Sequence, residues 1–222
     1  MQLQAHAHLK GMQYMNSKAL ETNTEKTILY IHGQGGNAGE AAHYRPLFPD
    51  CRVVGMEYRA ASPWEAAEEF PRLYDALCGK CASVTLIANS IGAYYAMLAL
   101  SDRPFEKAFF ISPVTDMERL ILDLMADAHV TEAALQAHRE IPTASGGVLS
   151  WDWLCRVRSC PITWNVPTYV LYGGRDTLLA PETFSAFAEK TGASLTVMEQ
   201  GEHWFHTPAQ MDFLDRWIRS RQ

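Results

Sequence analysis

The chain has 222 residues, which is enough for one sizeable hydrophobic core and short for two, so its length predicts a single domain. A hydrophobic fraction of 48% and a charged fraction of 20% are typical of a globular protein and exclude an extensively disordered one. The net charge of -6, without a cluster of Lys and Arg, argues against a nucleic-acid partner.

Targeting signals and cysteines indicate the compartment. No signal-peptide core is visible near the start, and no run of about 18 uncharged apolar residues occurs, so no membrane span is expected. Five cysteines form an odd, sparse set, which indicates reduced thiols in the cytoplasm. Cys78 and Cys81 have the CxxC spacing of redox motifs, but they end a predicted helix and precede a strand, and Gly79 resembles the helix C-cap. We interpret this pair as structural.

Apolar, β-branched runs alternate with helical segments from residue 26 to residue 222, whereas residues 1–25 give no clear structural signal. Such alternation predicts one α/β domain in which a mainly parallel, doubly wound sheet is covered on both faces. The six strands are expected at residues 26–32, 52–58, 83–89, 107–112, 168–173 and 194–199.

Three helices are marked by their first residues. Ser62 and Thr207 each precede a proline and have the character of N-caps, and a further helix is expected from Pro181 to Gly192. Pro71 is expected to kink or restart the helix that follows Ser62.

Residues 114–165 are more numerous than a simple crossover between two strands requires. They contain an apolar helical stripe that includes Met125, followed by Trp151 and Trp153. We expect a small helical cap or lid here, with a helix merely packed on the sheet edge as the alternative.

A serine lies between the third predicted strand and the helix after it, in the sequence Ala88-Asn89-Ser90-Ile91-Gly92. Small neighbours allow a sharp turn that holds the serine side chain above the sheet. This segment resembles the nucleophile elbow of the α/β-hydrolase family, whose pattern is G-x-S-x-G, with Ala88 in place of the first glycine. The resemblance runs from about residue 26 to the C-terminus and implies that Ser90 is a nucleophile.

In that family an acid and then a histidine follow the serine along the chain, after late strands. Asp176 and His203 follow the fifth and sixth predicted strands, at the edge where parallel α/β sheets bind ligands. The resemblance therefore implies a Ser90–His203–Asp176 triad. Asp116, which follows the fourth strand, is the alternative acid.

His206, near His203, is interpreted as a surface residue or as a neighbour that supports the site without acting in it. His203 and His206 with Glu202 suggest a metal site only weakly, because no third ligand is apparent, and we expect no metal.

The segment "HGQGG", residues 32–36, resembles the family's His-Gly loop. The resemblance implies that the backbone N–H groups of Gln34 and Ile91 bind an oxyanion, while His32 is more often structural. The loop lacks the Lys-Ser/Thr ending of a phosphate-binding P-loop and the spacing of a dinucleotide fingerprint.

These features predict a serine hydrolase without metal or organic cofactor, acting on a carboxylic ester, thioester or amide. Its partner is a small molecule of small to medium size and partly hydrophobic character, with Trp151, Trp153, Trp204 and Met125 as candidate pocket residues. Two alternatives stay open: another chemistry on the same triad, such as a C–C hydrolase, lyase or acyltransferase, or a binding scaffold without catalysis.

Overall fold

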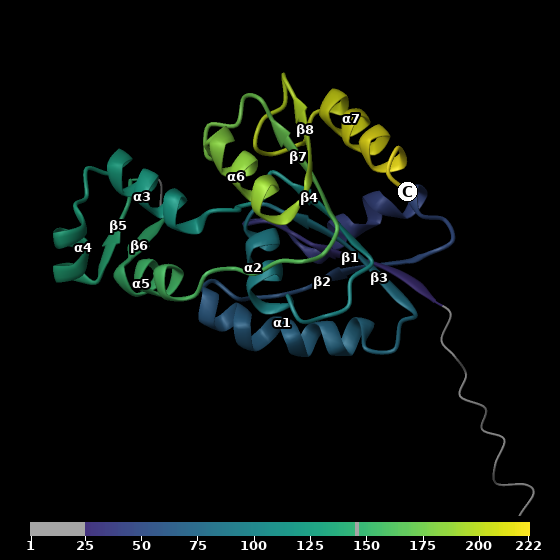
Figure 1. Ribbon diagram of the computed structural model, residues 1–222, viewed down its shortest axis with the longest axis horizontal. Coiled ribbons are helices and arrows are strands. Elements are labelled where there is room, and N and C mark those ends of the chain that lie inside the picture. The colour runs from purple at the N-terminus through teal and green to yellow at the C-terminus, as the bar shows by residue number, and fades with distance from the viewer. Residues whose placement is uncertain (1–24, 145–146) are drawn as a thin grey trace, which may run out of the picture.

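A six-stranded parallel sheet forms the centre of the protein (Figure 1). The computed structural model describes residues 25–144 and 147–222. The sheet order is β2-β1-β3-β4-β7-β8, and every neighbouring pair is parallel. The strands are β1 (Lys26–Ile31), β2 (Arg52–Met56), β3 (Ser83–Asn89), β4 (Lys107–Ile111), β7 (Thr168–Gly173) and β8 (Ser194–Met198). All six expected strands are present, while the uncertain segment 1–25 lies outside the described residues except for its last residue.

Helices cover both faces of this sheet. Successive side chains of a strand point to opposite faces, and because both sets are apolar here, both faces need a covering layer. In β1, Leu29 and Ile31 pack against one set of helices, and Ile28 and Tyr30 against the other. The first face carries α1 (Pro63–Cys78), α2 (Ile91–Ala99) and α6 (Pro181–Thr191); the second carries the 3₁₀ helix η1 (Ala38–Leu47) and α7 (Pro208–Arg219). The predicted doubly wound α/β fold is confirmed.

The caps expected from the sequence form where they were predicted. The Ser62 hydroxyl accepts a hydrogen bond from the Glu65 N–H, and Thr207 forms a reciprocal capping box with Gln210. Gly192 ends α6 with φ at 74°, in the left-handed region that favours glycine. The expectation that Pro71 restarts α1 is wrong, because α1 continues through it to Cys78.

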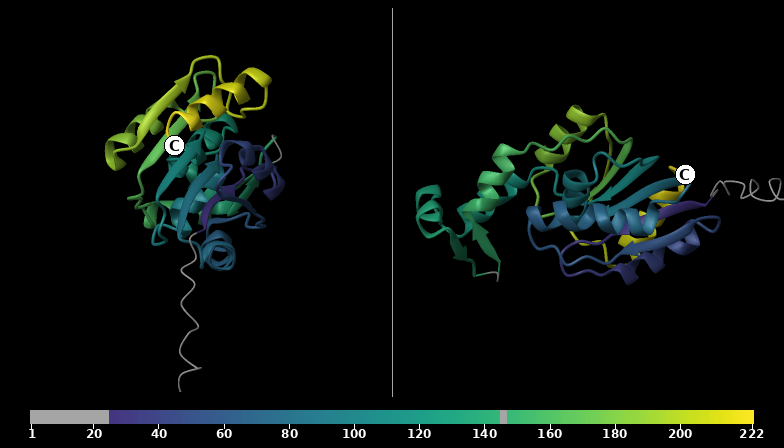
Figure 2. Two further views of the ribbon diagram at one scale, coloured as in Figure 1. Left: turned by 90° about the vertical axis from the view of Figure 1, so that its right-hand side faces the viewer. Right: turned by 90° about the horizontal axis from the view of Figure 1, so that it is seen from below.

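The segment between β4 and β7 lies to one side of the sheet (Figures 1 and 2). It contains α3 (Met117–Asp127), α4 (Glu132–His138), β5 (Glu140–Pro142), β6 (Val148–Ser150) and α5 (Trp151–Ser159). Strands β5 and β6 pair antiparallel. We call residues 114–165 the cap segment. Its small hairpin was not expected from the sequence, which indicated helices alone.

The CxxC pair lies at the end of α1, away from the carboxyl ends of the strands. Cys78 is buried, and burial raises the pKa of its thiol to about 12, which keeps it protonated and weakly nucleophilic. The Cys81 sulfur accepts hydrogen bonds from Thr27 and Arg52 at the start of the neighbouring strands. These contacts favour the structural interpretation of the pair.

None of the helices within residues 25–144 and 147–222 has the length and apolar character required to cross a membrane.

The core prediction concerns Phe110 in the central strand β4, which is fully buried and packs against Trp164 and Phe187. Phe110→Ala is expected to lower the free energy of unfolding by about 3–5 kcal/mol, because it leaves a cavity between the sheet and its helices. Denaturant unfolding measures this change. Val148→Ala, at a side chain that is 56% exposed, serves as the control and is expected within about 0.5 kcal/mol of the wild type.

Candidate active site

Ser90 forms the turn between β3 and α2 in a backbone conformation that is rare for residues other than glycine. Its φ is 48° and its ψ is −122°. The Ser90 N–H donates to the Ile111 carbonyl at 3.0 Å, and the Ser90 carbonyl accepts from the Val114 N–H at 3.2 Å. The neighbouring strand β4 and the residues that follow it therefore hold the turn on both sides of the serine.

Close packing around the turn explains the small residues in the sequence. A Cβ atom on Gly92 would lie 2.2 Å from the His32 carbonyl oxygen, so only glycine lets α2 approach the loop after β1 this closely. One on Gly33 would lie 3.2 Å from the Ser90 Cβ. Ala88, which replaces the family's first glycine, is fully buried in the core, where its methyl group is accommodated.

The structure brings Ser90, His203 and Asp176 together from three separate strand ends. The Ser90 Oγ lies 2.9 Å from the His203 Nε2, and the His203 Nδ1 lies 2.7 Å from the Asp176 Oδ2. The other carboxylate oxygen, Oδ1, accepts from the N–H groups of Leu178 and Leu179 at 2.8 and 3.1 Å.

The Asp176 side chain is 2% exposed, against 24% for His203. The arrangement joins a hydroxyl, an imidazole and a fixed, buried carboxylate in one hydrogen-bonded line.

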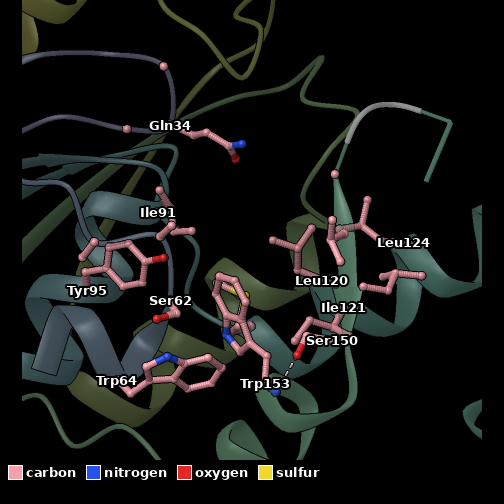
Figure 3. Close-up of a pocket in the computed structure, with 18 of the residues that line it drawn as sticks. Gln34, Ser62, Trp64, Ile91, Tyr95, Leu120, Ile121, Leu124, Ser150 and Trp153 are labelled. Carbon is pink, nitrogen blue, oxygen red and sulfur yellow. Dashed lines mark hydrogen bonds between the residues drawn. The ribbon is translucent and has the colours of Figure 1, made fainter. Parts of the chain in front are cut away.

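A cavity of about 630 Å³ is lined by Ile91, the residue after Ser90, whereas the side chains of Ser90 and His203 are not part of its wall (Figure 3). Gln34 and Ile91, the two expected oxyanion donors, both line it, as do His32, Gly33 and Gly35. The rest of its wall comes from the loop between β2 and α1, from α1 and α2, and from the cap segment, with Tyr58, Ser62, Tyr95, Leu120, Ile121, Leu124 and Trp153 among the lining residues.

His32 has a packing role in the loop after β1. Its Nδ1 lies 2.8 Å from the Gly33 carbonyl oxygen, and its ring stacks on Tyr58 with centroids 4.2 Å apart. Tyr58 in turn donates to the His32 carbonyl at 2.9 Å. These contacts fix the loop that carries Gln34.

A family model described as "Alpha/beta hydrolase family" matches residues 28–215. The chain belongs to the alpha/beta hydrolase family. No curated protein sequence matches the chain.

Solved structures of other hydrolases of this fold superpose on the chain. Alpha/beta hydrolase domain-containing protein 10 from mouse has a TM-score of 0.72 at 14% identity and covers 88% of each chain. Est1E from Butyrivibrio proteoclasticus has a TM-score of 0.68 at 12% identity and covers 92% of this chain and 89% of its own. A Paleococcus ferrophilus monoacylglycerol lipase has a TM-score of 0.60 at 15% identity and covers 90% of this chain and 97% of its own. At these identities the similarity is one of fold.

Within this hydrolase fold, the alternative acid and the second histidine lie in other surroundings. Asp116 is the N-cap of α3 and accepts from the Arg119 N–H at 2.9 Å, and the carboxylate that contacts His203 belongs to Asp176. His206 is exposed, with its Nδ1 2.7 Å from the Trp204 carbonyl oxygen. In the described parts of the chain no group of three or more His, Cys, Asp or Glu side chains could hold a metal ion.

The four candidate pocket residues lie in different places. Trp153 lines the cavity. Met125 is buried in the hydrophobic core, and Trp151 packs against that core outside the cavity wall. Trp204 is 70% exposed and stacks on His206.

Sequence reasoning missed other cavity residues. Leu120, Ile121 and Leu124 belong to the helical stripe that the sequence already showed, which was a usable signal. For Tyr58 and Tyr95 no such signal exists in the sequence.

Gly92→Ala tests the close approach of α2 to the loop after β1. In an ordinary helix this change would raise the free energy of unfolding by about 1 kcal/mol. Here, however, the new methyl group would collide with the His32 carbonyl oxygen. We expect a net loss of about 1–3 kcal/mol in the free energy of unfolding, measured by denaturant titration.

Gly147→Ala provides the matched control, since its nearest contact would be an ordinary 3.4 Å to the Thr143 hydroxyl. Equal stabilities of the two variants would contradict the steric argument.

Proposed function

We propose that the protein is a serine hydrolase that cleaves a carboxylic ester, thioester or amide through an acyl-enzyme on Ser90. The observation that carries the proposal is the hydrogen-bonded line from the Ser90 hydroxyl through His203 to Asp176. A serine hydroxyl is a weak nucleophile near neutral pH, and this geometry supplies the base it needs.

The proposed reaction has two halves. The Ser90 oxygen attacks the substrate carbonyl carbon while its proton passes to the His203 Nε2, and the same proton then leaves on the departing alcohol, thiol or amine. Water next attacks the acyl-enzyme, gives its proton to His203 and releases the acid as Ser90 regains a proton. These steps use only side chains of this chain and water.

Asp176 keeps the imidazole in the orientation that the reaction requires. With its carboxylate facing Nδ1, the neutral His203 carries its proton on Nδ1 and leaves the Nε2 lone pair facing Ser90. The two backbone N–H groups on Oδ1 stop the carboxylate from rotating away.

The N–H groups of Gln34 and Ile91 are the proposed oxyanion donors. Ile91 is the first residue of α2, where backbone N–H groups have no partner within the helix and the helix dipole favours negative charge. Loss of one such donor typically raises the barrier by about 2.7–4 kcal/mol. Both residues line the cavity, which supports this role.

The proposed substrate is a small molecule of small to medium size and partly hydrophobic character, since leucine, isoleucine, tryptophan and tyrosine side chains line the cavity. Structures of similar fold, among them a monoacylglycerol lipase and an esterase domain from Rhodothermus marinus, also support ester hydrolysis.

A fluorophosphonate probe tests the nucleophile directly. We expect covalent labelling of the wild type at Ser90 and none of Ser90→Ala, read out by intact-protein mass spectrometry and peptide mapping. Hydrolysis of short and long p-nitrophenyl esters is expected to fall in Ser90→Ala by roughly 10⁶-fold or to the detection limit.

Other results would redirect or overturn the proposal. Labelling without turnover of any ester would favour a C–C hydrolase, lyase or acyltransferase on the same side chains. An unlabelled wild type would favour a binding scaffold.

Asp176→Asn tests the orienting carboxylate. The amide NH₂ group would face Nδ1 and favour the tautomer with its proton on Nε2, so His203 could no longer accept the Ser90 proton. We expect kcat for ester hydrolysis to fall by about 10⁴-fold with little change in stability.

Asp116→Asn is the matched control and is expected to retain wild-type kcat, because that side chain caps α3. A larger loss in Asp116→Asn than in Asp176→Asn would reverse the assignment of the acid.

A further inference from the structure

Tyr95, in the second turn of α2, reaches the cavity with a rigidly held side chain. Only 2% of the residue is exposed, and its ring packs against Tyr58, Phe70 and Tyr94 with centroids 5.8 to 6.2 Å apart. It lines the cavity, and Figure 3 shows its hydroxyl directed into the space between α2 and the cap segment. The aromatic neighbours therefore fix where this hydroxyl lies.

Every other hydroxyl side chain that lines the cavity has a structural partner. Tyr58 donates to the His32 carbonyl, Thr143 donates to the Gly147 carbonyl, and Ser62 and Ser150 accept from backbone N–H groups as N-caps of α1 and α5. The Tyr95 hydroxyl has no hydrogen-bond partner among the described residues, yet it is not one of the fully enclosed, unsatisfied polar atoms. It is therefore an unpaired polar group that opens onto the cavity.

An unpaired hydroxyl that faces a cavity indicates what the cavity binds, because a ligand that displaces water from the hydroxyl must replace the lost hydrogen bond. Burial raises the pKa of Tyr95, so the group keeps its proton and can both donate and accept. Leu120, Ile121 and Leu124 of α3 offer apolar contacts, while Gln34, Arg59 and Glu140 line other parts of the cavity. Between the apolar side chains of α3 and the Tyr95 hydroxyl, the cavity can hold an apolar chain that carries a polar oxygen.

We propose that Tyr95 is a specificity-determining residue whose hydroxyl hydrogen-bonds a hydroxyl or carbonyl oxygen on the otherwise apolar half of the ester. The substrate class is then an oxygenated ester, such as a hydroxyalkanoate or the monoester of a diol. Ile91 and Tyr95 are four residues apart on α2, which places their Cα atoms about 6 Å apart along the helix. The proposed oxyanion donor and the Tyr95 side chain thus come from successive turns of one helix in the cavity wall. This inference rests on the proposed function and names the substrate class of the same site.

Matched ester pairs test the proposal in the full-length protein. For the acyl side, p-nitrophenyl esters of six-, eight- and ten-carbon acids are compared with their terminally hydroxylated counterparts, so that one chain length brings its hydroxyl to Tyr95. For the alcohol side, acetates of simple alcohols are compared with monoacetates of the corresponding diols. We expect the wild type to prefer one hydroxylated ester about tenfold in kcat/KM over its plain counterpart.

Tyr95→Phe removes only the hydroxyl and is expected to reduce that preference to about one. Tyr74→Phe is the matched control and should keep the wild-type preference, since its buried hydroxyl bonds the Pro104 carbonyl and its side chain lies outside the cavity wall. Absence of any preference in the wild type, or a preference that survives in Tyr95→Phe, overturns the proposal.

A binding measurement separates failure of this inference from failure of the proposed function. Titration calorimetry compares the amides of the same plain and hydroxylated acids, which need no catalysis. If fluorophosphonate labelling and ester turnover both fail, tighter binding of a hydroxylated amide by the wild type but not by Tyr95→Phe still supports the Tyr95 contact. Equal binding of both amides by both proteins refutes it.

Discussion

The positive φ of Ser90 is the constraint on which the candidate site depends. A residue with a Cβ atom in this region stores about 1–3 kcal/mol of backbone strain, so the conformation persists only where neighbouring contacts impose it. The hydrogen bonds to Ile111 and Val114, together with the close approach that Gly92 allows, supply those contacts. A relaxed turn would carry the hydroxyl away from His203. The strain is therefore the cost of holding the proposed nucleophile at the edge of the sheet.

Sheet order sets the distances that the other two side chains must span. β7 lies two strand spacings from β3 and β8 lies three, which correspond to about 10 and 14 Å. The loop after β8 must therefore fold back toward β3 to bring its histidine to the serine. It does so over Gly173, where a Cβ atom would lie 2.4 Å from the Gly201 carbonyl oxygen, and Arg175 donates to that same oxygen at 2.8 Å. Glycine at position 173 thus contributes to the site without contacting it.

The parts of the fold and site that the sequence could predict are those set by local patterns. Strands buried on both faces leave continuous apolar runs, caps leave short motifs, and the elbow leaves small residues around Ser90. The hairpin of β5 and β6 has three residues in each strand, too few to show a periodicity. Pocket residues were harder to predict because lining depends on tertiary packing. Trp204 follows His203 in the chain yet stacks on His206 at the surface.

Helix α3 shows why an apolar stripe cannot by itself distinguish a core residue from a pocket residue. Met125 on that stripe is buried in the core, whereas Leu120 and Leu124 are only partly buried and line the cavity. Ile121 does both. Since such a stripe spans at least a quarter of the helix surface, one edge can pack on the core while the other faces the cavity. The cap segment is thus anchored by the same helix that forms the apolar wall.

The polar groups near the reacting centre do not come from α3. The triad side chains lie at the carboxyl edge of the sheet, and the Ile91 N–H lies at the start of α2. Substitutions at Leu120 or Leu124 of α3 are therefore expected to alter the apolar contacts of a substrate while leaving the serine turn and its hydrogen bonds unchanged.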